Sequence, residues 1–271
     1  MIDPRAALDA IGLLPDTEID LAGAALQLAR IDAPNADWKA AQEALSAIAR
    51  DAAPLSRVTR LVNRADAINR LLAVHYGFYG DTETYDDLAN ANLIRVIERR
   101  CGLPVALGVI WLHAARAAGW AANGVDFPAH FMVALQGKST QLVLDVFHGG
   151  VTMGTDNLRI LLHQIEGHAQ LRPGLLAPMN ARQVLMRLQN NIVTRRLQAG
   201  DLDGALACIE DMLRIGPDEV ELWRQAAMLN QQLDRVTAAL RCFERCLALV
   251  PRGDTAVRIR SAMDGLRGRL N

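Results

Sequence analysis

The sequence DLDGALACIEDMLRIGP at residues 201–217 recurs 34 residues later, as RVTAALRCFERCLALVP at residues 235–251. Small, apolar, acidic and proline residues return in one register across the two copies. The matched pairs are Ala205 with Ala239, Leu206 with Leu240, Cys208 with Cys242, Glu210 with Glu244, Leu213 with Leu247, and Pro217 with Pro251. A fixed period over a whole segment indicates a repeated supersecondary unit, so we expect an array of like elements here.

The period of 34 residues is that of the tetratricopeptide repeat, in which each unit is a pair of antiparallel helices. The alanines of the register are small enough for two helices of one hairpin to approach closely, and the prolines end the second helix of each unit. The amphipathic segment Thr255–Leu270 is expected to cap the last exposed face. We therefore predict an all-α C-terminal domain over residues 177–271, which would bind a protein or peptide partner.

Upstream of the repeats, residues 1–176 are predicted to form a second domain that is mostly helical. Apolar residues recur at intervals of three and four in the segments Leu21–Arg30, Trp38–Arg50 and Leu55–His75, which predicts amphipathic helices. The strongly apolar run Val105–Ala118 is predicted to be the buried central helix. A proline directly before this run suits the first position of a helix, and the glycine after it suits the end.

From residue 127 to residue 148 the apolar pattern changes to a period of two, which predicts a β-hairpin. Gly137 and Lys138 suit a two-residue turn, and a hairpin that is symmetric about this turn would place His130 opposite Asp145. Directly opposed residues have Cβ atoms roughly 4.5–5.5 Å apart, close enough for a carboxylate to hold an imidazole in one tautomer. His130 and Asp145 are therefore predicted to meet as a functional pair.

Four stretches of this domain carry a family resemblance: Tyr76–Gly80 (YGFYG), Asn90–Leu107 (NANLIRVIERRCGLPVAL), Gly124–Phe131 (GVDFPAHF) and Leu144–Gly150 (LDVFHGG). In order and spacing they resemble the bacterial SirB regulator-like family, and the resemblance covers nearly the whole chain. Members of that family look like a transglutaminase-like domain followed by tetratricopeptide repeats. The implied fold class is α+β and mostly helical: helices surround a small antiparallel sheet, and an all-α hairpin array follows.

The resemblance also implies a candidate site. In the wider transglutaminase-like superfamily, a cysteine at the start of the central helix attacks an acyl group, a histidine takes its proton and an aspartate orients the histidine. His130 and Asp145 match the last two roles. Counting back along the central helix from Gly119 places Pro104 in the position of the cysteine, and Cys101 lies three residues earlier. The candidate catalytic residues are therefore Cys101, His130 and Asp145, with Cys101 either a reactive thiol or a small buried residue before a turn.

Two functions from different classes remain open. Because proline cannot act as a nucleophile, the first is a catalytically degenerate protein that serves as a protein-binding or regulatory scaffold. Because the histidine and the aspartate are both present, the second is a thiol-dependent enzyme, a cysteine protease or an acyl transferase, that uses Cys101, His130 and Asp145. The chain departs from the family pattern beside this pair, with Ala129 where glycine is common and Val146 where proline is common.

The composition narrows the choice of partner and of compartment. The 271 residues include 29 Lys and Arg against 30 Asp and Glu, so no excess positive charge is available to hold nucleic acid or an anionic membrane. Acidic residues near the N-terminus and the short apolar runs predict neither a secretory signal nor a membrane span, and we expect a cytoplasmic protein. Cys242 and Cys246 share a helix face, but they have no further ligands nearby, so no metal and no cofactor is predicted.

Overall fold

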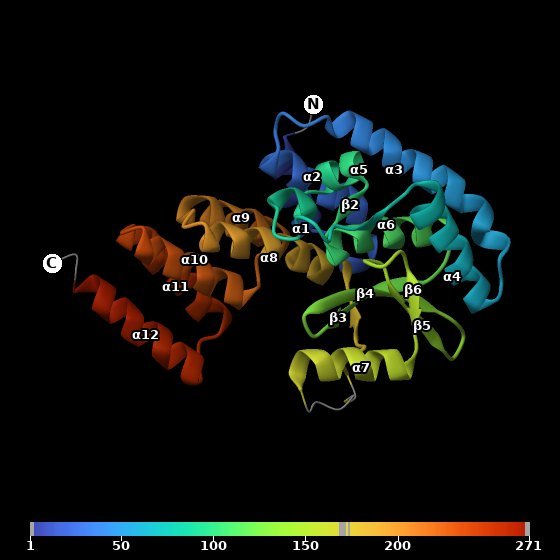
Figure 1. Cartoon of the computed structure of the whole chain (residues 1–271). Helices are drawn as coiled ribbons and strands as arrows, with labels where there is room; N and C mark the ends of the chain where they lie inside the picture. The colour runs from blue at the N-terminus through green and yellow to red at the C-terminus, as the bar shows by residue number, and fades with distance from the viewer. Residues whose placement is uncertain (1–2, 168–171, 173, 269–271) are drawn as a thin grey trace. The chain divides into compact units, whose positions relative to one another are not determined.

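The computed structural model of the chain describes residues 3–167, 172 and 174–268 and divides into two compact units (Figure 1). Unit 1 combines Met1–Leu14 with Gln189–Asn271, and unit 2 is Pro15–Leu188. Helix α8, Ala181–Gln198, begins in unit 2 and ends in unit 1. Because one helix runs through both units, the division does not decide the predicted domain boundary at residue 177, which stays a prediction.

Unit 2 has the predicted fold class, α+β and mostly helical, and its sheet is small. Its helices before the sheet are α2 (Leu21–Asp32), α3 (Trp38–Ala52), α4 (Leu61–Asn69), α5 (Leu93–Arg99) and α6 (Pro104–Ala117). Helix α7 (Thr155–Glu166) follows the sheet, and the short helical turns are η1 (Asp16–Glu18), η2 (Ala53–Arg57), η3 (Arg70–His75) and η4 (Leu88–Ala91). The strands are β1 (Tyr79–Gly80), β2 (Cys101–Gly102), β3 (Ala122–Phe127), β4 (His130–Gln136), β5 (Gln141–Asp145), β6 (Val151–Met153) and β7 (Pro178–Met179).

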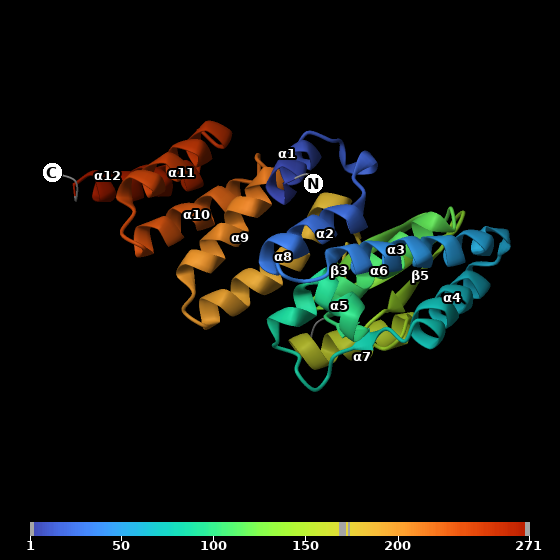
Figure 2. The same ribbon diagram turned by 90° about the horizontal axis from the view of Figure 1, so that it is seen from above.

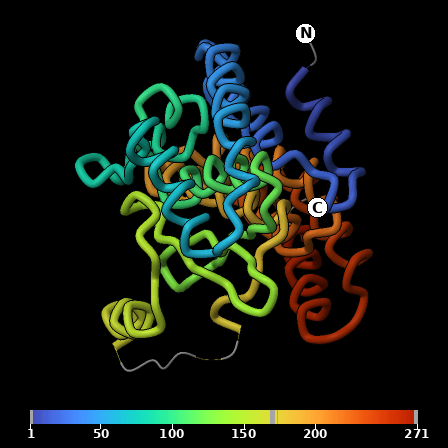
Figure 3. The backbone as a smooth tube through the Cα atoms, turned by 90° about the vertical axis from the view of Figure 1, so that its right-hand side faces the viewer, coloured from blue at the N-terminus to red at the C-terminus, as the bar shows by residue number. Residues whose placement is uncertain are grey.

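The main sheet has five strands in the order β6-β5-β4-β3-β7, and all neighbours are antiparallel. The predicted hairpin is β4 and β5, whereas β3, β6 and β7 were not predicted. Helices cover both faces: α6 lies against one face, and α7 lies on the other (Figure 1). The backbone tube shows α7 end-on, on the side of the strands away from α3 (Figure 3). A second, two-stranded parallel sheet joins β1 to β2.

The contact between α6 and the main sheet is close because glycine occupies the contact point. Helix α6 is buried around most of its circumference, as its continuous apolar run predicts. At Gly108 a Cβ atom would overlap the Phe131 ring of β4. The ring therefore rests directly on the backbone of the helix, and this contact holds the start of β4 against α6. Leu158 and Leu162 of α7 pack on the opposite face of the sheet, against a core cluster that includes Met132.

One predicted helix is interrupted. The spacing predicts a single helix over Leu55–His75, but the structure divides the segment into η2, α4 and η3, with residues 58–60 extended or bent between the first two. Its last part, η3, has π-helical hydrogen bonding, which leads the chain into β1. The three-and-four spacing of apolar residues continues across the break, so the pattern alone could not reveal it.

Unit 1 contains the predicted helical array. Beyond α8, its helices are α9 (Leu202–Ile215), α10 (Val220–Gln232), α11 (Val236–Leu249) and α12 (Asp254–Arg267), and they lie side by side in succession (Figure 2). Each repeat proline lies two residues after the last residue of a second helix: Pro217 follows α9, and Pro251 follows α11. Cys246 lies in the core that α11 shares with α12, beside Phe243 and Met263.

The N-terminal helix α1, Pro4–Gly12, packs on α9 within unit 1, a pairing that was not predicted. Arg5 donates to the buried carboxylate of Asp211 at 2.8 Å, and Arg214 pairs with Asp9 at 2.8 Å. At Gly12 a Cβ atom would overlap the backbone carbonyl oxygen of Arg214. Short repeat arrays need their end faces covered, and α1 contributes to covering α9.

The substitution Gly12→Ala should lower the free energy of unfolding by about 1–3 kcal/mol, because the backbone carbonyl it meets cannot move aside as a side chain could. Gly265→Ala is the matched control, since Gly265 lies in α12 and a methyl group there would meet no neighbouring atom within 4 Å. The control should stabilise the helix by roughly 0.5–1 kcal/mol. Urea unfolding followed by circular dichroism measures both, and equal stability of Gly12→Ala and the native chain would contradict this packing.

Candidate functional site

Asp145, the last residue of β5, is at the centre of the candidate site. Its Oδ1 atom lies 3.1 Å from Nε2 of His130, the first residue of β4, and the side chains are 8% and 16% exposed respectively. The approach is an electrostatic contact rather than an aligned hydrogen bond, because the buried Nε2 atom has no partner of suitable geometry. The structure thus brings His130 and Asp145 together.

The predicted register of the hairpin was wrong, because β5 is displaced along β4 by two residues. Val133 lies opposite Leu144, and the two-residue turn is at residues 138–139, one position later than predicted. The N–H of Gly137 donates to the carbonyl oxygen of Thr140 at 2.7 Å and closes this turn. Glycine therefore precedes the turn instead of occupying its first central position.

The contact between His130 and Asp145 survives the register error for a geometric reason. Side chains alternate between the two faces of a strand, so a displacement of two residues leaves every side chain on the face where it was expected. The two residues then become diagonal rather than direct neighbours. A diagonal separation of about 7–8 Å at Cα remains within reach of a side chain as long as histidine.

His148 belongs to the site but was not predicted. Its Nδ1 atom lies 2.8 Å from Oδ2 of Asp145, and the imidazole is 63% exposed. The backbone N–H groups of Phe147 and His148 also donate to Oδ1 of Asp145, at 3.1 Å and 3.4 Å. A sequence signal exists, since an aspartate three residues before a histidine in a turn can bond both the backbone and the ring.

The surroundings of Asp145 act on its pKa in opposite directions. Burial raises the pKa, but the contacts with His130 and His148 outweigh burial and hold the pKa of Asp145 below its ordinary value. Asp145 is therefore ionised at neutral pH and offers a fixed negative charge to two imidazoles. Such a carboxylate can orient a histidine and stabilise its protonated form.

Cys101 lies elsewhere, in β2, where it pairs with Tyr79 of β1. Its Sγ atom is 3.9 Å from Oδ2 of the buried Asp81, which also receives a hydrogen bond from Arg99 at 2.6 Å. Burial raises the pKa of Cys101, Arg99 lowers it and Asp81 raises it, and the net pKa lies above the ordinary value. The polar partner of this thiol is thus a carboxylate and not the imidazole of His130.

Asp81 is fixed by its own loop. It accepts hydrogen bonds from the backbone and the hydroxyl of Thr84, at 2.8 Å and 2.7 Å, in addition to the bond from Arg99. These bonds, the one from the Thr84 backbone first, hold the pKa of Asp81 far below its ordinary value. The negative charge beside Cys101 is therefore permanent at neutral pH, which disfavours a thiolate there.

Pro104 is the first residue of α6 and is buried. Its fixed φ suits this position, and its missing N–H costs no intrahelical hydrogen bond there. Ala129, just before His130, has a φ of 51°, which is in the left-handed region. A glycine adopts this conformation without strain, and this explains physically why glycine is common at that position in the resembling family.

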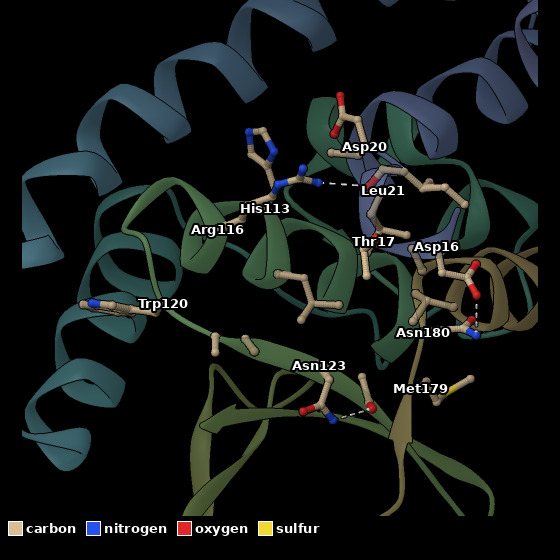
Figure 4. A pocket seen from close by; sticks show the side chains of 18 residues that line it. Asp16, Thr17, Asp20, Leu21, His113, Arg116, Trp120, Asn123, Met179 and Asn180 are labelled. Atoms are coloured by element: carbon tan, nitrogen blue, oxygen red, sulfur yellow. Dashed lines mark hydrogen bonds between the residues drawn. The ribbon is translucent and has the colours of Figure 1, made fainter. Parts of the chain in front are cut away.

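A separate cavity of about 260 Å³ lies within unit 2, between η1, α6, β3 and the start of α8 (Figure 4). Two polar groups on its wall have partners: Asp16 accepts from Asn180 at 2.8 Å, and Arg116 donates to the carbonyl oxygen of Ile19 at 2.9 Å. None of the three predicted site residues lines it. The cavity is therefore not part of the candidate site.

Within the described residues, no group of three His, Cys, Asp or Glu side chains is arranged to hold a metal ion. Across those same parts of the chain, no helix is both long and apolar enough to cross a membrane.

The lowered pKa of Asp145 predicts that the effect of Asp145→Asn on the free energy of unfolding depends on pH. A carboxyl group whose pKa is lower in the folded state than in the unfolded state stabilises the fold at pH values above its unfolded pKa, which is about 3.9 for aspartate. This stabilisation is lost as the pH falls through the folded-state pKa. At pH 7 we expect Asp145→Asn to lose about 1–3 kcal/mol of unfolding free energy, and at pH 3 less. Asp156→Asn is the control: its side chain is 89% exposed, and its effect should stay within about 0.5 kcal/mol. An Asp145→Asn penalty that is constant from pH 3 to pH 7 would exclude the lowered pKa.

Comparison with known proteins matches a different family to each of the two parts of the chain. Residues 39–190 match the family described as the transglutaminase-like superfamily, and residues 194–264 match a tetratricopeptide repeat family. The first match contains Cys101, His130, Asp145 and His148, and the second covers the helices from α9 to most of α12.

Relatives with similar sequences occur in bacteria and in animals. A UPF0162 protein of Xylella fastidiosa (strain Temecula1) is 32% identical over 189 residues, which are 68% of this chain and 67% of that protein. A UPF0162 protein of Vibrio cholerae is 26% identical over 208 residues, 75% of this chain and 76% of that protein. The F-box only protein 21 of Mus musculus is 25% identical over 169 residues, 58% of this chain but 26% of that protein. The chain therefore belongs to the transglutaminase-like superfamily, and a tetratricopeptide repeat region follows its transglutaminase-like domain.

Proposed function

We propose that this chain is a catalytically degenerate transglutaminase-like protein that acts in the bacterial cytoplasm as a protein-binding, regulatory scaffold. The observation that carries the proposal is Pro104 at the first position of α6, where the superfamily resemblance places the nucleophilic cysteine. Proline has no group that can attack an acyl carbon. In this proposal His130 and Asp145 stabilise the turn after β5 and take no part in a reaction.

The surroundings of Cys101 support the loss of activity. The thiolate is the nucleophilic form of cysteine, and reactive cysteines lie beside positive groups that lower the thiol pKa. Cys101 instead lies 3.9 Å from the carboxylate of Asp81, and burial is the main cause that raises its pKa. An imidazole that could accept its proton contacts Asp145 instead.

The repeats supply the binding surface in this proposal. Tetratricopeptide arrays commonly bind partners on the face formed by the first helix of each repeat, which here includes α10. On α10, Arg224 donates to Glu221 at 2.7 Å and to the sulfur of Met228 at 3.0 Å, and Gln225 donates to Glu221 at 3.2 Å. Met228 is 44% exposed. These four residues, the α10 face, present polar groups in fixed positions around an apolar side chain, which lowers the entropic cost of binding.

The alternative function is a thiol-dependent enzyme, a cysteine protease or an acyl transferase, in which Cys101 reaches His130. The observation in its favour is the 3.1 Å contact between His130 and Asp145, which matches the arrangement of a base and its orienting acid. It requires that the Sγ atom of Cys101 comes within hydrogen-bonding distance of the His130 imidazole when substrate binds.

The double substitution Arg224→Glu with Met228→Glu tests the scaffold function. Cellular partners cross-linked to the native chain should be identified by mass spectrometry, and we expect their recovery with this variant to fall about tenfold or more. The variant Thr237→Glu with Arg241→Glu makes the same change of charge on exposed positions of α11 and should retain the partners. Cys101→Ala and His130→Ala should retain them as well.

The opposite pattern would support the enzyme. If the partners are lost in Cys101→Ala and His130→Ala but kept in the variant Arg224→Glu with Met228→Glu, they are substrates trapped at the thiol. A covalent adduct on Cys101 in the native chain would lead to the same conclusion.

A further inference from the structure

The cavity of about 260 Å³ in unit 2, the η1–α6 cavity, has the size of a site for a small molecule. Pockets that bind drug-sized ligands measure about 300–1,000 Å³, and an apolar cavity of about 150 Å³ is large enough for benzene. Its lining comes from residues 16–22, the C-terminal half of α6 with Trp120, residues 121–124, and residues 179–184. All of these residues belong to unit 2, so one compact unit forms the whole cavity.

Part of the cavity wall is apolar. Ile19, Leu112 and Val184 are buried in the wall, each at most 9% exposed. Leu21 and Met179 also line the cavity and are half-buried, so they leave apolar surface open to it. An aliphatic group that enters the cavity would leave water for contact with these side chains, which is favourable in proportion to the apolar area buried.

Arg116 of α6 supplies a positive charge in the lining. Its Nη1 atom donates to the carbonyl oxygen of Ile19 at 2.9 Å, and across the described residues its guanidinium makes no other hydrogen bond. A guanidinium carries five N–H donors in a fixed fork whose geometry matches a carboxylate. Most of this fork is therefore available to a carboxylate that enters the cavity.

Asp20 supplies a negative charge next to this guanidinium. It directly follows Ile19, the residue whose carbonyl oxygen Arg116 binds, and it lines the same cavity. Figure 4 shows the Arg116 and Asp20 side chains on the side of the cavity away from Asn123 and Met179. Asp20 is exposed and makes no capping hydrogen bond with α2, and its carboxylate has no partner in the described parts of the chain. Two neighbouring opposite charges are thus left without an ion pair between them.

The other titratable groups of the lining have partners within the chain. The carboxylate of Asp16 pairs with Arg182 at 2.6 Å. The imidazole of His113 is held through Nε2 by the carbonyl oxygen of Leu45, at 2.9 Å. Among the described residues that line the cavity, the unpaired charges are therefore one guanidinium and one carboxylate.

We propose that the η1–α6 cavity binds a free α-amino acid with an aliphatic side chain. Its carboxylate lies on Arg116, its ammonium group faces Asp20, and its side chain contacts the apolar wall. In an α-amino acid the two charges are joined through one carbon atom, which suits neighbouring charges of opposite sign. The inference goes beyond the proposed scaffold function, because it concerns a small molecule in a cavity that Cys101, His130 and Asp145 do not line.

The pair of charges argues against other ligands. An anion without an ammonium group would bring a second negative charge beside Asp20, and a cation without a carboxylate would bring a second positive charge beside Arg116. Like charges placed together weaken binding. A neutral apolar molecule would remove both charges from water and offer them no partner, which is costly. A ligand that carries both charges balances both residues.

The test uses the full chain, labelled with ¹⁵N, and four probes: leucine, glycine, 4-methylpentanoate and 3-methylbutylamine. Glycine lacks the aliphatic side chain of leucine, 4-methylpentanoate lacks its ammonium group, and 3-methylbutylamine lacks its carboxylate. Millimolar leucine should shift amide signals at residues 16–22, 121–124 and 179–184, and each of the other probes should bind about tenfold or more weakly. Absence of these shifts with leucine, or equal affinity for any of the other three probes, would overturn the proposal.

Matched variants test the two charges one at a time. Arg116→Gln and Asp20→Asn each remove one charge and should each weaken leucine binding about tenfold or more. Asparagine is as good an N-cap residue as aspartate, so the second variant should keep α2 intact. Arg258→Gln and Asp156→Asn make the same changes at exposed positions outside the cavity and should bind leucine within about twofold of the native chain. Circular dichroism checks the fold of each variant, and native affinity for leucine in folded Arg116→Gln or Asp20→Asn would contradict the assignment.

Discussion

The contact between Phe131 and the backbone of α6 at Gly108 determines the geometry of the transglutaminase-like domain. No side chain separates the ring from the helix, so the central helix and β4 approach as closely as their backbones allow. Pro104 begins the helix one turn before this contact, and His130 precedes Phe131 on the strand. One contact therefore sets the positions of Pro104 and of the His130 imidazole in this domain.

The arrangement of these residues does not by itself show that they catalyse a reaction. Asp145 has two backbone N–H groups and two imidazoles around it, so it stabilises the turn after β5 whether or not a reaction takes place. A buried carboxylate with several donors is costly to lose, because its removal leaves those donors without a partner. The presence of a histidine and an aspartate is thus no measure of catalysis by itself. The nucleophile is the decisive component, and here the thiol has a carboxylate for a neighbour.

Local and repetitive patterns made part of this structure predictable from the sequence. The 34-residue register predicted that α9 and α11 carry equivalent residues at equivalent positions, and the apolar run of α6 predicted a buried helix. The hairpin of β4 and β5 follows from its period of two, but its register depends on which residues form the turn, and glycine at either of two neighbouring positions satisfies that pattern. The packing of α1 on α9 and the pairing of β3 with β7 join residues far apart in sequence, which no local period encodes. His148 was missed because its role comes from a turn that brings its ring back to Asp145.

The proposed loss of catalytic activity requires that Cys101, the thiol nearest to the position of the nucleophile, is not activated. It is tested most directly by the rate at which iodoacetamide alkylates Cys101 in the native chain as a function of pH, read by mass spectrometry at the Cys101 peptide. We expect a midpoint above about 8.5, the value of a free cysteine, and no change in His130→Ala. A midpoint below about 7 that is lost in His130→Ala would contradict this expectation and assign the site to a working thiol enzyme.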